Sequence, residues 1–370
     1  MTAGRHRSSA SLLALAYATL VLYASLYPFE GWRWPPGMAA WELPRLPWPR
    51  YFIPFDITSN LLAYAPLGLL ITVARLRHGG GPAAAVGMAW LAGSLLSCSM
   101  EITQHLLPQR VPSSLDAVLN AGGTLLGALL ALALHGLGLL RRWQRARERW
   151  LDDGNGGALA LLVLWPAALL FPTPVPLGVG QVGDVLRAAL SRALDGVPWA
   201  EPAAAWLASA SPAARALAPW AEGATVLLGL LSPCLLAFAV ARPGWRRAGL
   251  ALGVLCIAAL ATTLSTVLNF GPEHAMAWRT PVTLGAYACA LALLLASLWM
   301  GPRLAGALAL VALTGLVVLV QQAPTDPYFA QSLQGWSQGQ FVRFHGLAQW
   351  VGWLWPFVAM AWLLGRLGRT

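Results

Sequence analysis

The chain has 370 residues, of which 58% are hydrophobic and only 10% are charged, and its 24 basic residues outnumber its 14 acidic ones. Soluble domains carry about 25% charged residues, so this composition excludes an ordinary soluble domain and predicts a polytopic membrane protein. The positive charge does not predict a nucleic-acid partner, because the arginines are dispersed over short loops. Retention beside anionic lipid on the cytoplasmic side explains them.

Apolar runs of roughly 20 residues are long enough to cross the hydrocarbon core of a bilayer. They predict an all-α, polytopic transmembrane helical bundle of about ten helices. In chain order the predicted helices lie at 10–28, 57–75, 83–106, 115–140, 157–177, 221–241, 247–268, 281–300, 302–322 and 346–365. The boundary before the ninth helix is soft, because only the four residues MGPR separate it from the eighth.

The arginines also predict the orientation of these helices. If the N-terminus is cytoplasmic, 15 arginines lie inside and 9 outside, including Arg5, Arg7, the run RRWQRARER at 141–149 and Arg369 on the inner side. The positive-inside rule then places both termini in the cytoplasm. We expect a multi-pass protein of the inner, or cytoplasmic, membrane.

Two extramembrane loops are of notable length, 29–56 and 178–220. The first alternates tryptophans with prolines and is predicted to lie along the outer membrane surface, because tryptophan favours the interface. A ligand-binding lip is the alternative reading of this loop. The second contains DVLRAALSRALDG at 184–196, whose spacing predicts a short amphipathic helix in the interface.

A weak internal repeat appears when the chain is shifted by 167 residues, so that 61–77 lies over 228–244. The match predicts two degenerate parallel repeats and two domains, 1–150 and 151–370. In this alignment Asp56 falls on Gly223 and Asn60 falls on Leu227. We therefore expect the chemistry in the first domain and support from the second.

Polar side chains form three acid-and-amide pairs in the first domain, each spaced three or four residues apart and hence on one helix face. Together with one arginine they are Asp56 and Asn60, Glu101 and Gln104, Asp116 and Asn120, and Arg110. The alternating direction of the helices puts all of them at the outer end. Ionised groups facing lipid cost about 2.5–3.5 kcal/mol each at mid-bilayer, so we expect one polar pocket that opens outward.

A purely structural reading remains open for two of the acids. Asp56 and Asp116 lie at predicted helix starts, where a carboxylate meets the positive end of the helix dipole. Glu101 lies near a predicted helix C-terminus, where the dipole disfavours a negative charge. Helix capping therefore does not explain Glu101.

The stretches FDITSNLLAYAPLG at 55–68 and EITQHLLPQRVPSSLDAVLNAGGTLLG at 101–127, with SLYPFEGW after the first helix, resemble the VanZ-like family, named after a teicoplanin-resistance protein. The resemblance covers about residues 10–140. Its signature positions fall on the seven polar residues above and on Pro66, Gly68 and Gly123. The resemblance implies a cell-envelope membrane protein that affects teicoplanin susceptibility.

Three functions are compatible with these residues. The first is binding of a polar lipid, an envelope precursor or a glycopeptide, because three acids against one arginine favour a cationic or hydroxyl-rich ligand. The second is an enzyme on a lipid-linked substrate, with Glu101 as the best candidate for general base and Arg110 holding a phosphate. The third is a lipid or solute transporter. We expect no cofactor, no metal site and no nucleic-acid partner, and expect membrane lipids as partners.

Overall fold

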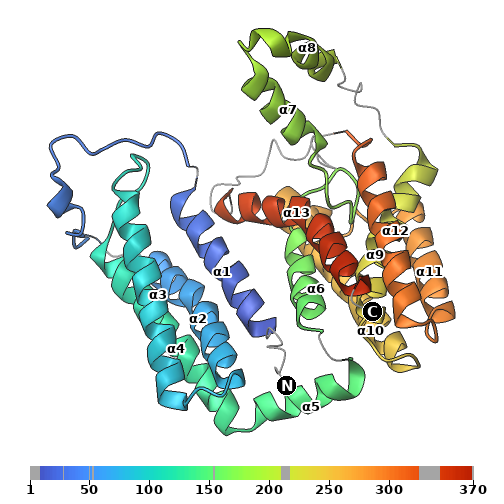
Figure 1. Ribbon diagram of the computed structural model, residues 1–370, viewed down its shortest axis with the longest axis horizontal. Coiled ribbons are helices and arrows are strands. Elements are labelled where there is room, and N and C mark those ends of the chain that lie inside the picture. The colour runs from blue at the N-terminus through green and yellow to red at the C-terminus, as the bar shows by residue number, and fades with distance from the viewer. Residues whose placement is uncertain are drawn as a thin grey trace. The chain divides into compact units, whose positions relative to one another are not determined.

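The computed structural model describes residues 9–27, 29–49, 51, 54–152, 155–209, 217–324 and 342–368. All regular elements in these ranges are helical, with thirteen α-helices and no strand (Figure 1). Seven of the helices are long and apolar enough to cross a membrane, so the chain is a multi-pass membrane protein. Arg5, Arg7 and Arg369, which contribute to the predicted orientation, lie outside the described residues.

The described chain divides into two compact units. Unit 1 comprises the residues through Arg149 together with 155–160, and unit 2 comprises 150–152 and the residues from Leu161 onward. Unit 1 contains α1 (Ser9–Leu26), α2 (Pro54–Arg77), α3 (Pro82–Gln104), α4 (Ser114–Gly136) and α5 (Leu139–Trp150). Figure 1 shows α5 lying across the direction of α2, α3 and α4.

Unit 2 holds the remaining helices, apart from the first residues of α6 (Gly156–Ala168). They are α7 (Gly183–Leu194), α8 (Glu201–Ser209), α9 (Pro219–Phe238), α10 (Arg246–Phe270), α11 (Pro281–Ala296), α12 (Pro302–Val320) and α13 (Val342–Leu367). The amphipathic helix predicted at 184–196 is α7, which is confirmed as a helix. Within unit 2, α9 packs against α10, α11 and α12.

Glycines let α2 and α4 approach until their backbones touch. A Cβ added at Gly123 would overlap the carbonyl oxygen of Leu61, and one added at Gly127 would overlap that of Ala65. A Cβ at Gly68 would overlap the Thr124 carbonyl in the same way. Because only glycine fits at such contacts, these positions fix how closely the two acid-bearing helices lie.

Each of the ten predicted apolar segments overlaps a helix, and among the described residues seven helices meet the length and hydropathy needed for a span. The end predicted for the fifth segment is wrong, since α6 stops at Ala168 instead of 177. Pro172, Pro174 and Pro176 follow, and three prolines within five residues remove the backbone N–H donors that a further helical turn would need. The soft boundary at 300 is a real one, because α11 ends at Ala296 and α12 begins at Pro302.

The arginine run at 141–149 is helical and forms most of α5, where the sequence was interpreted as a charged connection between spans. The parallel repeat stays a prediction. Both α2 and α9 carry a proline inside the helix, Pro66 and Pro233, at positions that the proposed repeat superposes.

Candidate functional site

The seven polar residues predicted from the sequence gather at one end of unit 1, and we call them the polar cluster. Asp56 lies in the first turn of α2 and Asp116 in the first turn of α4. Glu101 and Gln104 lie in the last turn of α3, whose C-terminus is at the same end. The α2, α3 and α4 helices pack against one another. The polar residues, which were predicted to lie at the same depth in the membrane, therefore also lie close to one another.

Glu101 is buried, with 5% of its surface exposed, and it holds the loop that starts α4. Its Oε2 accepts a hydrogen bond of 2.8 Å from the backbone N–H of Ser113. Ser113 is in turn the N-cap of α4, and its Oγ accepts from the backbone N–H of Asp116. The carboxylate therefore fixes the geometry of the turn that presents Asp116.

Gln104 and Arg110 both bind the end of α1. The Gln104 amide donates to the carbonyl of Ser25 at 3.0 Å. Nη2 of Arg110 donates to the carbonyls of Ala24 and Tyr27 at 2.8 and 2.6 Å. Carbonyls in the last turn of a helix have no partner within the helix and carry partial negative charge, so an arginine there is favourable.

Asp116 and Asp56 form the more exposed part of the cluster. Asp56 is exposed and Asp116 is partly buried. Asn60 lies close enough to Asp116 to stabilise its negative charge, while Asp56 lies close enough to repel it. Two neighbouring carboxylates at the starts of α2 and α4 attract a cation or a set of hydrogen-bond donors.

Asn120 lies deeper between α3 and α4, with 5% exposure. Its amide nitrogen donates to Ser97 Oγ at 2.9 Å, and its backbone carbonyl accepts from Thr124. Among the described residues, Asn120 Oδ1 has no hydrogen-bond partner, and the buried hydroxyl of Tyr64 on α2 lies near Ser97 and Glu101. A buried oxygen without a donor is a costly feature that a bound water or ligand group can relieve.

The tryptophan-rich loop crosses the same end of unit 1. The backbone N–H of Arg33 donates to the carbonyl of Leu106, and Ser114 donates to the carbonyl of Pro47 through both its N–H and its Oγ. Trp32, Trp34, Trp41 and Trp48 are all exposed. The loop therefore contacts the segment after α3 and the start of α4, at the end of unit 1 that carries the acids.

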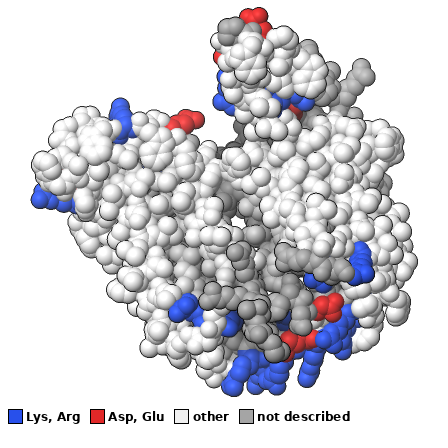
Figure 2. All heavy atoms as spheres, viewed as in Figure 1, with Lys and Arg blue, Asp and Glu red and all other residues white. Residues whose placement is uncertain are grey.

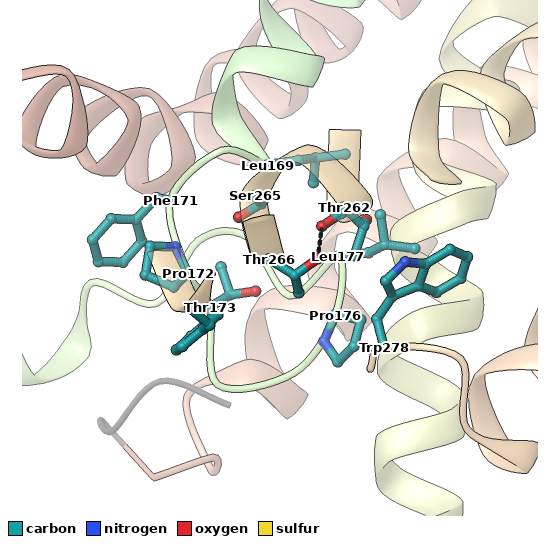
Figure 3. Close-up of a pocket in the computed structure, with 11 residues that line it drawn as sticks. Leu169, Phe171, Pro172, Thr173, Pro176, Leu177, Thr262, Ser265, Thr266 and Trp278 are labelled. Carbon is teal, nitrogen blue, oxygen red and sulfur yellow. Dashed lines mark hydrogen bonds between the residues drawn. The ribbon is translucent and has the colours of Figure 1, made fainter. Parts of the chain in front are cut away.

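Unit 2 contains a small cavity of about 30 Å³, lined without any ionisable side chain (Figure 3). It lies between α10 and the irregular segment that follows α6, next to the hydroxyls of Thr262, Ser265 and Thr266. The volume suits one or two waters. Ser265 Oγ and the Asn269 amide both donate to the carbonyl of Leu170, so these groups satisfy the backbone left open where α6 ends.

The helix predicted at 247–268 stops one residue before Asn269, whereas α10 continues to Phe270. Asn269 is buried in the last turn of α10. Its spacing of four from Ser265 on an apolar helix is the signal that could have indicated a buried polar face.

The sequence also does not predict the structural role of Arg247. This residue is completely buried and donates to the carbonyls of Phe238, Ala241, Leu298 and Met300, which follow or end α9 and α11. Its guanidinium lies over the Phe238 ring. Nothing in the sequence distinguished it from Arg246 beside it.

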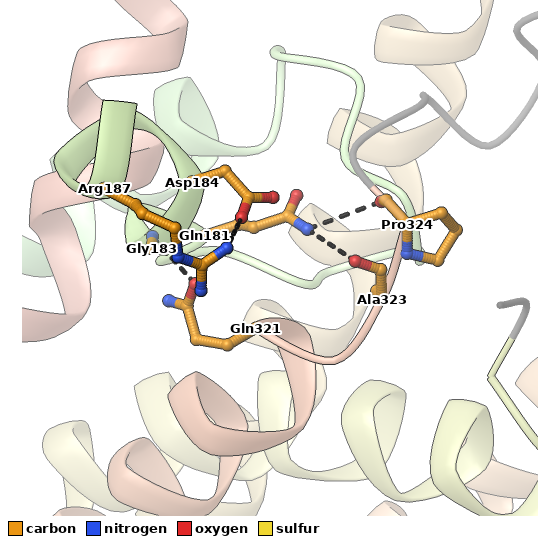
Figure 4. Close-up of polar contacts among 7 residues, drawn as sticks. All are labelled: Gln181, Gly183, Asp184, Arg187, Gln321, Ala323 and Pro324. Carbon is orange, nitrogen blue, oxygen red and sulfur yellow. Dashed lines mark hydrogen bonds and ion pairs between the residues drawn. The ribbon is translucent and has the colours of Figure 1, made fainter. Parts of the chain in front are cut away.

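Two glutamines join the segment before α7 to the end of α12 in unit 2 (Figure 4). Gln321 accepts from the backbone N–H of Gly183 and donates to the carbonyl of Gly180. Gln181 donates to the carbonyl of Ala323 at 3.0 Å. These bonds leave the side chains satisfied and identify a structural clamp.

Comparison with known families agrees with the geometry of unit 1. Residues 6–135 match the family model VanZ/LLP1. This segment is a VanZ-like domain. No curated protein and no solved structure matches the chain. The VanZ-like domain contains the whole polar cluster. Unit 2 lies outside the matched residues.

Proposed function

We propose that the VanZ-like domain binds the polar headgroup of an envelope molecule at the polar cluster and thereby alters susceptibility to teicoplanin. The ligand is a polar lipid, an envelope precursor or a glycopeptide, and the groups it presents are cationic or hydroxyl-rich. The protein acts in the cytoplasmic membrane, with the cluster outward and both termini inside. The observation that carries the proposal is that Asp56 and Asp116 lie in the first turns of α2 and α4, two helices whose backbones are in contact.

The repulsion between the two acids supports a donor-rich ligand. The Asn60 amide offsets part of the negative charge, but Asp56 stays exposed beside Asp116. A cationic or hydroxyl-rich group between them replaces repulsion with charge-assisted hydrogen bonds, which contribute about 1.5–3 kcal/mol each. The exposed tryptophans of the adjacent loop suit the apolar part of an amphipathic ligand.

The contacts divide the polar cluster into two roles. Asp56 and Asp116 are accessible to a ligand, whereas Glu101, Gln104 and Arg110 hold the α1 end and the α4 start in place. A general base must reach the proton that it removes. Glu101 is nearly inaccessible and bonded to the Ser113 backbone, a geometry that favours positioning over catalysis.

The test compares three variants in native lipid particles at equal folded abundance: Asp56→Asn, Asp116→Asn and the matched control Glu222→Gln. Glu222 is an acid in the first turn of α9 in unit 2, so it controls for loss of one charge at a helix start. Mass spectrometry identifies the lipids and precursors that co-purify. We expect a specific molecule to be depleted about tenfold or more by each aspartate variant and retained by Glu222→Gln.

Teicoplanin susceptibility of cells producing each variant is the second readout. We expect both aspartate variants to shift susceptibility and Glu222→Gln to match the parent. Identical co-purified molecules and identical susceptibility for all four proteins would refute binding at the polar cluster.

A further inference from the structure

The α5 helix separates its apolar and cationic side chains along its length. At 100° per residue, Leu139 and Trp143 fall on one side, and Arg141 and Arg145 fall on nearly the opposite side. Leu139 is 40% exposed and Trp143 is 56% exposed, and both arginines are exposed, as is Arg142. In water an exposed tryptophan beside an exposed leucine is unfavourable, so this surface suits an amphipathic environment.

Contacts within unit 1 fix the rotation of α5 about its axis. Leu140 packs against the buried cluster of Ala10, Val73, Ala74 and Ala131. Arg147 Nε donates to Asn155 Oδ1 at 2.7 Å, on the same side of the helix as Leu140. With that side held by the protein, the apolar and cationic sides are both left facing outward.

The charged side chains of α5 are almost all positive. Five arginines lie between 141 and 149 and the helix carries a single acid, Glu148, which accepts from the Gln144 amide at 2.8 Å. Figure 2 shows basic side chains gathered along the edge of the molecule where Figure 1 places α5. The α2 helix also ends at this side of unit 1 in Arg75 and Arg77.

We propose that α5 is a binding surface for anionic phospholipid headgroups. The helix lies in the membrane interface, with Leu139 and Trp143 at the acyl boundary and Arg141, Arg142 and Arg145 on lipid phosphates. Its direction across α2–α4 is the direction that an interfacial helix requires. Arginine matches phosphate oxygens through paired N–H donors, and each basic residue near an anionic surface adds about fivefold in affinity.

This surface is distinct from the polar cluster. The α4 helix begins beside Asp116 and ends just before α5, and its 23 residues span about 35 Å. The two sites therefore lie at opposite ends of unit 1, and either can exist without the other.

The test is native mass spectrometry of the full chain released from mixed micelles of phosphatidylglycerol and phosphatidylcholine. The variant is Arg141→Gln, Arg142→Gln and Arg145→Gln together. The control removes the same charge from three exposed arginines elsewhere, as Arg33→Gln, Arg45→Gln and Arg279→Gln. We expect the wild-type chain and the control to retain phosphatidylglycerol preferentially and the α5 variant to lose that preference by tenfold or more.

A second variant replaces the same three α5 arginines by lysine and keeps the charge. We expect it to retain the preference, and we expect added salt to weaken retention in all proteins that show it. Equal phosphatidylglycerol retention by the α5 glutamine variant and its control overturns the proposal. So does a lysine variant that binds as little as the glutamine variant, or a dimer of the wild-type chain that the α5 glutamine variant dissociates without any change in bound lipid.

Discussion

Both units use an arginine to hold helix ends, and unit 1 places the acids of the polar cluster at the same end as its arginine. In unit 2, Arg247 is completely buried and binds four carbonyls near the ends of α9 and α11. In unit 1, Arg110 is partly buried and binds two carbonyls at the end of α1. The backbone at both places is satisfied by one guanidinium.

The difference separates folding from function. Folding accounts for both arginines, for the glutamine clamp and for the hydroxyls of α10, because each satisfies backbone groups that a membrane would leave without partners. The helix dipole favours each acid at its own helix start, but it does not account for placing Asp56 close enough to Asp116 to repel its charge. In the predicted repeat, Gly223 and Leu227 stand at the positions of Asp56 and Asn60.

The largest effect is expected from removing the buried arginine. Arg247→Met should lower the free energy of unfolding of unit 2 by about 3 kcal/mol or more, because four carbonyls lose a charged donor. Arg110→Met should cost about 1–2 kcal/mol, since two carbonyls are affected and the site is less buried. Thermal unfolding in detergent measures both, with the exposed Arg242→Met as control. If Arg247→Met and Arg242→Met have the same melting temperature, the Arg247 guanidinium does not stabilise unit 2.

Substituting a glycine at the contact between α2 and α4 should have an intermediate effect on stability. Gly127→Ala should destabilise unit 1 by about 1–3 kcal/mol, because the new methyl group meets the Ala65 carbonyl and pushes α2 from α4. Gly87→Ala in unit 1 and Gly253→Ala in unit 2 have open space at the Cβ and should be neutral or stabilising by up to about 1 kcal/mol. The yield of monodisperse protein and its melting temperature report the difference. Equal melting of all three variants would contradict backbone contact between α2 and α4.

The smallest effect on stability is expected for Glu101→Gln. This variant distinguishes the positioning residues of the polar cluster from the ligand-binding ones. Glu101→Gln keeps an acceptor for the Ser113 N–H and should cost about 1 kcal/mol or less, whereas Glu101→Ala leaves that N–H buried and should cost about 1–3 kcal/mol. The Gln variant should retain the molecule that Asp116→Asn loses. Co-purification and melting measured on the same samples test this ordering. Loss of the molecule in Glu101→Gln at unchanged stability would make Glu101 a direct ligand-binding residue.

Much of the polar cluster could be predicted because it depends on local rules. Spacings of three and four put each acid and amide on one helix face, and the alternation of spans put the three faces at one end. Which atoms meet could not be predicted. Glu101 with the Ser113 backbone and Arg110 with the α1 carbonyls are contacts between segments whose relative placement is set by packing.

Prediction and structure also differ where hydropathy gives no information about which side of a helix is packed. Arg246 and Arg247 are adjacent and chemically identical, yet only Arg247 is fully buried, because only its side of α10 meets the ends of α9 and α11. The apolar run at 157–177 predicts one continuous helix, but α6 ends before Pro172, Pro174 and Pro176. The irregular segment that follows exposes the Leu170 carbonyl, which α10 satisfies.

The sequence by itself determined that the chain is a multi-pass helical membrane protein, where its apolar helices lie, and which end of the first unit carries the acids. These properties follow from composition and from spacing along one chain. Only the tertiary structure decided that α2 and α4 touch through glycines, that Glu101 is buried while Asp56 is exposed, and that α5 turns its arginines outward. Burial and partner choice depend on residues far apart in the chain, and those distances exist only after the helices have packed.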